Sequence, residues 1–182
     1  MTDQMRALSD AEVALLGLLA ERPKHAWQIE KDVEYRDMRF WTDLSTSTIY
    51  KRLGALERAG MVASRTEIVD GRARKVHALT DLGRGTLEAR LIELLTEPEH
   101  VRWRVDVATY NMDLLSKDDA VSALSAYREK LRDEVRAYDE LEDFMSSSDC
   151  PSHRLAVARR PVFLLEAEIL WVTGFIEALK VD

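Results

Sequence analysis

The sequence is poor in cysteine, and it has no uninterrupted apolar stretch long enough to cross a membrane. Its single cysteine, Cys150, excludes a disulfide within the chain and is typical of a reducing cytoplasm. The N-terminus mixes charged residues with its leucines and lacks the apolar core of a signal peptide. The most apolar tract, FLLEAEILWVTGFIEAL, is interrupted by three glutamates. These absences predict a soluble cytoplasmic protein without membrane contact.

Signatures of catalysis and of metal binding are missing as well. There is no Gly-rich phosphate loop, no nucleophile elbow and no positioned pair of carboxylates. The histidines do not have the spacing of metal ligands; they are His25, His77, His100 and His153. We therefore expect no enzymatic activity, no metal and no cofactor.

The pattern that is present is mostly helical. With 182 residues, 46% of them hydrophobic, the chain can bury a substantial core. Ser9 and Glu12 form a capping box that opens the first helix. Apolar spacing and breaks at proline predict helices at about residues 9–20, 25–36, 44–60, 80–96, 102–116, 117–145 and 152–179.

The spacing of apolar residues changes from a helical to a strand-like pattern once, between the third and fourth helices. VASRTEIV and KVHAL favour strands, and the intervening DGRAR contains Asp-Gly, a strong signal of a hairpin turn. The sequence therefore predicts a mostly α protein. We expect an α+β head at residues 1–85, a winged helix-turn-helix, followed at 86–182 by an all-α dimerisation region that also senses an effector.

Charge divides along the same boundary. The chain as a whole has a formal net charge of -7, which argues against nucleic acid. Residues 1–85, however, carry 14 Lys and Arg against 13 Asp and Glu, whereas residues 86–182 carry 12 against 20. Residues 45–75 carry 7 against 3. Phosphate affinity depends on charge at the contact surface, so this local excess favours a basic, DNA-binding head on an acidic body.

The third helix presents two different faces. Its buried stripe is supplied by Ile49, Leu53 and Leu56. The opposite side, which we call the recognition face, is small, hydroxylated and cationic; it comprises Ser47, Lys51, Gly54 and Arg58, flanked by Thr48, Tyr50 and Ala55. Ser45 can cap the first turn, and Gly60 suits a left-handed end. Such a surface suits a major groove, although an ordinary amphipathic helix with a solvated face would have the same pattern.

Three segments together resemble the PadR family of bacterial transcriptional regulators. They are LLGLLAERPKHAWQIEKDVE, LSTSTIYKRLGALERAGMV and DGRARKVHALTDLGR. The family pattern is matched at Gly17, Leu18, Leu19, Pro23, His25, Ile29, Ser45, Thr48, Tyr50, Leu53, Leu56, Glu57, Gly60, Arg74, Lys75, Leu79, Thr80 and Gly83. The chain departs from it at Ala26, Trp27 and His77, which we expect to lie away from the recognition face.

The resemblance implies a dimeric transcription factor, usually a repressor, that binds an inverted-repeat operator in double-stranded DNA. DNA contacts are expected from Ser45, Ser47, Thr48, Tyr50, Lys51 and Arg52 on the third helix and from Arg72, Arg74 and Lys75 on the wing. The cations among them would neutralise phosphates. An alternative is a protein-interaction adaptor, a winged helix without operator affinity that docks a partner through its acidic helices.

The last helix carries a seam with the 3-4 spacing of a coiled coil. The predicted dimer contacts are Leu165, Ile169, Val172, Ile176 and Leu179. A helical bundle within one chain would use up the same seam, and this alternative stays open. A neighbouring apolar face with Trp171 and Phe175 requires further cover, which favours a homodimer. Trp103, Trp171 and Phe175 are the candidate pocket for a small aromatic or apolar effector, although buried tryptophans are more often core.

Overall fold

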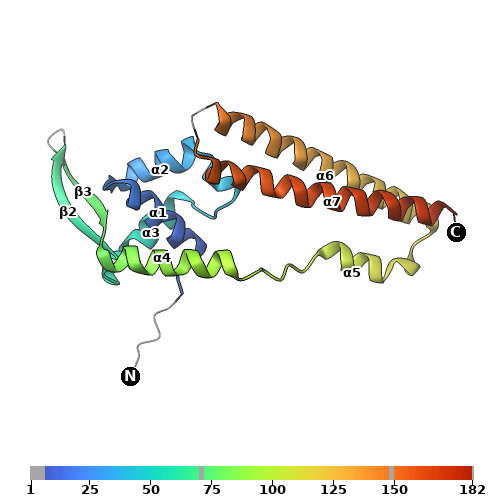
Figure 1. Ribbon diagram of the computed structural model, residues 1–182, viewed down its shortest axis with the longest axis horizontal. Coiled ribbons are helices and arrows are strands. Elements are labelled where there is room, and N and C mark those ends of the chain that lie inside the picture. The colour runs from blue at the N-terminus through green and yellow to red at the C-terminus, as the bar shows by residue number, and fades with distance from the viewer. Residues whose placement is uncertain (1–6, 70–71, 148–149, 182) are drawn as a thin grey trace, which may run out of the picture. The chain divides into compact units, whose positions relative to one another are not determined.

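The computed structural model describes residues 7–69, 72–147 and 150–181, and it divides into two compact units at residues 1–99 and 100–182 (Figure 1). The first unit contains α1 (Asp10–Glu21), β1 (Lys24–His25), α2 (Ala26–Tyr35), the 3-10 turn η1 (Met38–Phe40), α3 (Thr46–Arg58), β2 (Val62–Val69), β3 (Arg72–Leu79) and α4 (Asp81–Thr96). The second contains α5 (Arg104–Tyr110), the 3-10 turn η2 (Met112–Leu114), α6 (Lys117–Ser146) and α7 (Ser152–Val181).

The helices of the first unit begin at residues whose side chains satisfy free backbone groups. The backbone N–H of Ser9 donates to the Glu12 carboxylate at 2.9 Å. The Ser45 hydroxyl accepts from the backbone N–H of Thr48 at 3.2 Å, and the Thr80 hydroxyl accepts from Gly83 at 3.0 Å. These caps explain why α1, α3 and α4 begin where the sequence predicts.

The core of this unit is built from the apolar stripes of its helices. Side chains from α1, α2, α3 and α4 and from β2 meet in one cluster; its members include Leu15, Leu16, Ile29, Val33, Ile49, Leu53, Leu56, Val62 and Leu87. The stripe predicted on α3 is therefore its buried face, which leaves the opposite face free for a ligand.

Two glycines hold the junction between α3, the hairpin and α4. Gly60 follows α3 with a φ of 73°, the left-handed conformation expected of a residue that ends a helix. A Cβ at Gly83 would lie 2.1 Å from the carbonyl oxygen of Met61, so no larger residue fits there without moving the backbone. Glycine at these positions lets the hairpin start directly after α3.

The sheet has three antiparallel strands in the order β1-β3-β2. The predicted hairpin is present, with Val62 opposite Leu79 and Val69 opposite Arg72. Strand β1 was not predicted; its two residues pair with β3, so that Lys24 faces His77 and His25 faces Val76. This short strand joins the start of α2 to the base of the wing.

The second unit is dominated by two antiparallel helices that lie side by side, α6 and α7 (Figure 1). Leu124 and Leu131 of α6 pack against Val172 and Ile176 of α7. The single helix predicted near residues 102–116 is instead the seven-residue α5 followed by η2. Across the described ranges, no helix has the length and apolarity of a membrane span. The predicted class, a winged helix-turn-helix with an all-α C-terminal region, is confirmed.

Candidate nucleic-acid interface

The recognition face of α3 is open to solvent. The side chains of Ser47, Tyr50, Lys51 and Arg58 are exposed, and Thr48 is half-buried. The Ser45 hydroxyl lies 2.8 Å from the Thr48 hydroxyl and 3.1 Å from that of Ser47. The start of α3 therefore displays a cluster of hydroxyls, a phenol and a cation, groups that can bond to phosphates and to the edges of bases.

Arg52 differs from the other cations of α3, because it makes an ion pair inside the unit. Its Nη1 lies 3.4 Å from Oε1 of Glu12, whose side chain is only 1% exposed. Glu12 belongs to α1, so the pair joins α1 to α3. A phosphate contact by Arg52 stays a prediction, and this geometry speaks against it.

The three cations predicted to contact DNA from the wing, Arg72, Arg74 and Lys75, all belong to β3. Arg74 lies opposite Glu67 and Lys75 opposite Thr66 in the register of the hairpin. The Lys75 ammonium lies 3.3 Å from the carboxylate of Glu57 on α3. The backbone of Arg72 begins β3, but its side chain and the tip residues 70–71 lie outside the described part of the structure.

A cavity of about 340 Å³ opens between the start of α2, α3 and β3. It is lined by His25, Ala26, Trp27, Tyr50, Leu53, Gly54, Glu57, Arg74, Lys75 and His77. Three of these, Ala26, Trp27 and His77, are the positions at which the sequence departs from the family pattern. The expectation that they lie away from the recognition face is wrong, because they share this cavity with Tyr50 and Gly54. The pairing of β1 with β3 brings them there.

Trp27 is the centre of the aromatic contacts in this cavity. Cζ of Arg74 lies 5.9 Å from the centroid of its ring, and Nζ of Lys31 lies 5.2 Å away. The ring of His25 stacks on it, with the centroids 6.1 Å apart. Distances of this size are typical of cation–π attraction. Trp27 thus links α2 to the basic strand of the wing.

Two titratable groups in the cavity have shifted pKa values. Burial lowers the pKa of His77, because desolvation disfavours the charged imidazolium, although the nearby Glu57 opposes the shift. A hydrogen bond from Ser64 lowers the pKa of Glu57, with help from Lys75. Near neutral pH the cavity therefore holds a neutral imidazole beside a carboxylate.

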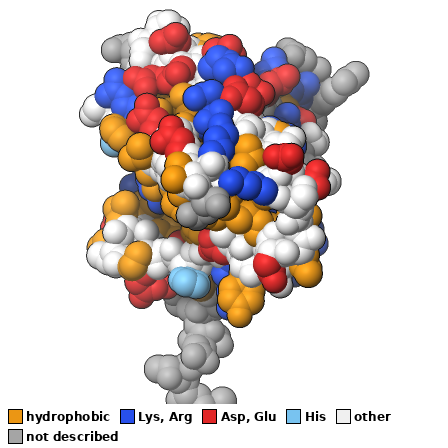
Figure 2. Space-filling view, turned by 90° about the vertical axis from the view of Figure 1, so that its right-hand side faces the viewer, with side chains coloured by type: hydrophobic (Ala, Val, Ile, Leu, Met, Phe, Trp, Pro, Cys, Tyr) orange, Lys and Arg blue, Asp and Glu red, His pale blue; other side chains and the backbone are white. Residues whose placement is uncertain are grey.

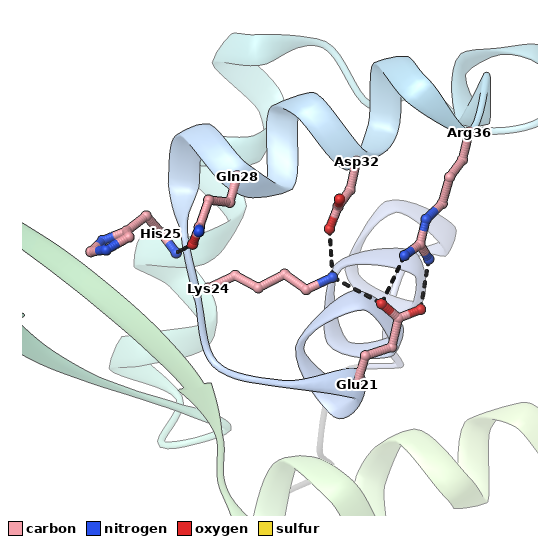
Figure 3. Close-up of polar contacts among 6 residues, drawn as sticks. All are labelled: Glu21, Lys24, His25, Gln28, Asp32 and Arg36. Atoms are coloured by element: carbon pink, nitrogen blue, oxygen red, sulfur yellow. Dashed lines mark hydrogen bonds and ion pairs between the residues drawn. The ribbon is translucent and has the colours of Figure 1, made fainter.

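An ion network around the buried Lys24 fixes β1 to α1 and α2 (Figure 3). The Lys24 side chain is 1% exposed, and its ammonium lies 2.9 Å from Glu21 and 2.5 Å from Asp32. Arg36 donates two hydrogen bonds to Glu21, at 2.6 and 2.9 Å. In Figure 3 the ring of His25 points away from this network. Lys24 of β1 thus belongs to the ion network, whereas the next residue, His25, lines the cavity.

The predicted dimer seam of α7 lies largely against α6 of the same chain. Val172 and Ile176 are 0% and 2% exposed, and the other three seam positions are half-buried at the same cluster. The α6–α7 pair therefore covers the seam without a second chain, and partner contacts by these five residues stay a prediction. Helix α7 also has exposed apolar side chains outside the seam; they include Phe163, Leu164, Leu170 and Trp171.

The candidate effector residues are only partly brought together. The rings of Trp171 and Phe175 stack, with their centroids 5.6 Å apart. Trp103 precedes α5 and is about half-exposed; within the described residues it has no ring contact with that pair. Figure 2 shows hydrophobic side chains exposed among acidic and basic ones on the face that it presents.

Within the described ranges, no three His, Cys, Asp or Glu residues are grouped as metal ligands would be.

The sequence of the first unit matches a known protein family. Residues 15–89 match the sequence model of the Transcriptional regulator PadR-like family. No curated protein matches the chain in sequence. The resemblance to the PadR family is thereby confirmed for the part of the chain that contains α3 and the wing.

Solved structures share the fold over nearly the whole chain. Bacillus subtilis PadR in complex with operator DNA is 21% identical, with a TM-score of 0.75 over 92% of this chain and 98% of that chain. The same protein in complex with p-coumaric acid is 21% identical, with a TM-score of 0.78 over 100% of both chains. The Vibrio cholerae virulence activator AphA is 18% identical, with a TM-score of 0.69 over 94% of this chain and 99% of that chain. At these identities the likeness establishes the fold.

Proposed function

We propose, on the premise that residues 15–89 match the sequence model of the Transcriptional regulator PadR-like family, that the protein binds double-stranded DNA as a homodimer and represses transcription from an inverted-repeat operator. The observation that carries the proposal is the placement of Tyr50 on the exposed face of α3 in one cavity with Arg74 and Lys75 of the wing. In this arrangement α3 enters the groove of the DNA, and the cations of β3 contact the flanking DNA backbone from the same unit.

Base contacts in this proposal come from the start of α3. Ser47, Thr48 and Lys51 offer short hydroxyls and one flexible cation, which suit close approach to base edges. In this proposal Tyr50 contacts a backbone phosphate, as do Arg72, Arg74 and Lys75 of the wing. Because the target is DNA, the expected place of action is the cytoplasm.

The second unit supplies the dimer in this proposal. Since α6 already covers the seam of α7, we expect the partner chain to pack on the exposed neighbouring face, where Leu164 and Trp171 lie seven residues apart. A two-fold axis between second units would match an inverted repeat, because each head would face one half-site.

The proposed effector is a small aromatic or apolar molecule that releases the operator. Bacillus subtilis PadR, whose fold this chain shares, has been solved in complex with p-coumaric acid, a ligand of this class. In this chain we assign the effector to the stacked pair Trp171 and Phe175. An effector that contacts the second unit would act by changing the separation of the two recognition helices.

The test is a gel shift with DNA from the region upstream of the gene itself. We expect retardation of this duplex at protein concentrations that leave an unrelated duplex of equal length free. Run-off transcription from the same DNA should fall as protein is added, whereas an activator would raise it. A protein that shifts neither duplex, yet captures a protein through its acidic helices, would support the adaptor instead.

A further inference from the structure

Trp27 occupies an unusual place for a tryptophan. It is the second residue of α2, and its side chain is 36% exposed, whereas Ile29 and Val33 supply the buried stripe of that helix. The indole therefore adds little to the core. Its contacts are instead with the charged side chains of Arg74 on β3 and Lys31 on α2.

Two contacts of His25 with β3 fix the position of the Trp27 ring. His25 pairs with Val76 in the sheet, one residue before α2 begins. Nδ1 of His25 lies 2.8 Å from the carbonyl oxygen of Lys75, and a ring nitrogen that faces a carbonyl must carry the proton and donate it. His25 lies two residues before Trp27, and Lys75 directly follows Arg74. The contacts of His25 with β3 therefore set the distance between the Trp27 and Arg74 side chains.

We propose that Trp27 is a positioning residue for DNA binding, whose ring holds the Arg74 guanidinium of β3 in place to meet a backbone phosphate. The inference rests on the proposed DNA-binding function. A guanidinium that lies over an aromatic ring keeps the N–H donors of its own plane free for phosphate oxygens. Arg74 then loses less rotamer freedom when DNA arrives, so more of its attraction contributes to affinity.

The neighbouring cation adds to the effect. Lys31, one turn along α2, lies 5.2 Å from the same ring. Trp27 thereby gathers positive charge from α2 and from the wing beside Tyr50 of the recognition helix. The start of α2 becomes part of the DNA-binding surface, which the recognition face and the wing alone do not include.

The decisive experiment is a double-mutant cycle on full-length protein with the shortest upstream duplex that the wild type binds, read by fluorescence anisotropy. We expect Trp27→Leu to weaken binding about fivefold per bound head, from the ordering cost of one long side chain. Trp27→Tyr keeps an aromatic face and should lose less than twofold. In the Arg74→Ala background, Trp27→Leu should have no further effect, because no guanidinium remains to be held.

Trp41→Leu is the matched control, since Trp41 is another exposed tryptophan of the same unit that lies outside the cavity. Whatever its own effect, it should add to that of Arg74→Ala. Thermal unfolding of the free variants reports any merely structural role. Equal losses from Trp27→Leu with and without Arg74, or a Trp27→Tyr variant as weak as Trp27→Leu, would overturn the inference alone. A wild-type protein that binds no upstream duplex would overturn the proposed function and the inference with it.

Discussion

Arg52 reaches back from the recognition helix to Glu12 of α1, with Nη1 3.4 Å from Oε1 of a carboxylate that is almost fully buried. The backbone N–H of Ser9 donates to the same carboxylate. A cation committed to a buried acid is less available to DNA, because a phosphate contact would leave that acid with one partner fewer. We therefore interpret Arg52 as a residue whose ion pair joins α3 to α1.

The salt dependence of DNA binding distinguishes this internal ion pair from contacts with phosphates. Lys51→Met removes an exposed cation of the recognition face, so in a dimer the slope of log affinity against log salt should become shallower by about 2. Arg52→Met should leave the slope unchanged and lower the free energy of unfolding by about 1–3 kcal/mol, the cost of weakening a buried hydrogen-bonded group. Titrations at several salt concentrations, with chemical unfolding of both variants, measure the two effects. A shallower slope for Arg52→Met would return it to the interface.

The internal network around Lys24 makes a stability prediction. Lys24→Met removes an almost fully buried ammonium from between Glu21 and Asp32, and each carboxylate then loses a partner. We expect the free energy of unfolding to fall by about 2 kcal/mol, below the full cost of breaking a buried pair because both carboxylates are partly exposed. Urea unfolding measures it. Lys51→Met, at an exposed position, should change it by less than about 0.5 kcal/mol; equal effects would mean that the network contributes nothing.

Much of the fold follows from local signals in the sequence. Ser9, Ser45 and Thr80 mark the starts of α1, α3 and α4, and the Asp-Gly turn marks the hairpin. Strand β1 has no such signal, because two residues show no period and their partner lies some fifty positions away in β3. Without β1, the position of Trp27 next to Arg74 cannot be foreseen.

The same limit applies to side chains whose partners are distant. Arg52 lies three residues from Ile49 and four from Leu56, so its place at the edge of the buried stripe is visible in the sequence. Glu12 already had a local role in the capping box, and nothing local indicates that it also faces Arg52. The seam of α7 is equally ambiguous, because a 3-4 repeat specifies an apolar partner helix and not the chain to which that helix belongs.

His77 makes the stability of the first unit depend on pH. Burial holds its pKa in the folded state below the ordinary value of 6.5, so the unfolded chain binds the proton more readily. Stability should therefore decline as the pH falls below about 6.5 and level off below the folded pKa. His77→Phe keeps a ring without a titrating group, and unfolding curves between pH 8 and pH 5 should show a smaller decline. Glu57, with its lowered pKa, loses its contribution only below about pH 4.5, outside this window.

Operator geometry tests the proposed homodimer. If two rigidly joined heads read an inverted repeat, the half-site centres lie a whole number of helical turns apart. Five inserted base pairs rotate one half-site to the opposite side of the duplex, so binding should collapse and then partly recover with ten. The measurement is a gel shift with all three spacings. Similar affinity for the three duplexes would rule out rigidly joined heads.

The effector proposal rests on the stacked pair Trp171 and Phe175. Ligand affinity and operator affinity must be linked reciprocally, so a hundredfold induction requires about 2.7 kcal/mol of differential affinity between the free and DNA-bound forms. Titration of aromatic acids, followed by quenching of tryptophan fluorescence with and without operator, should therefore give two different affinities. Equal affinities would mean that the ligand binds without switching.

Trp171→Ala decides whether this pair is the site. Removing the indole leaves Phe175 without its stacking partner and should weaken the ligand about tenfold, within the range for a lost aromatic contact. Because Trp171 also lies on the face proposed for the partner chain, operator affinity in the absence of ligand is compared at protein concentrations at which sedimentation shows the variant to be a dimer. Trp41→Ala is the control for the loss of one fluorophore. If Trp171→Ala binds the ligand and releases the operator like the wild type, the stacked pair is packing and the effector contacts other residues.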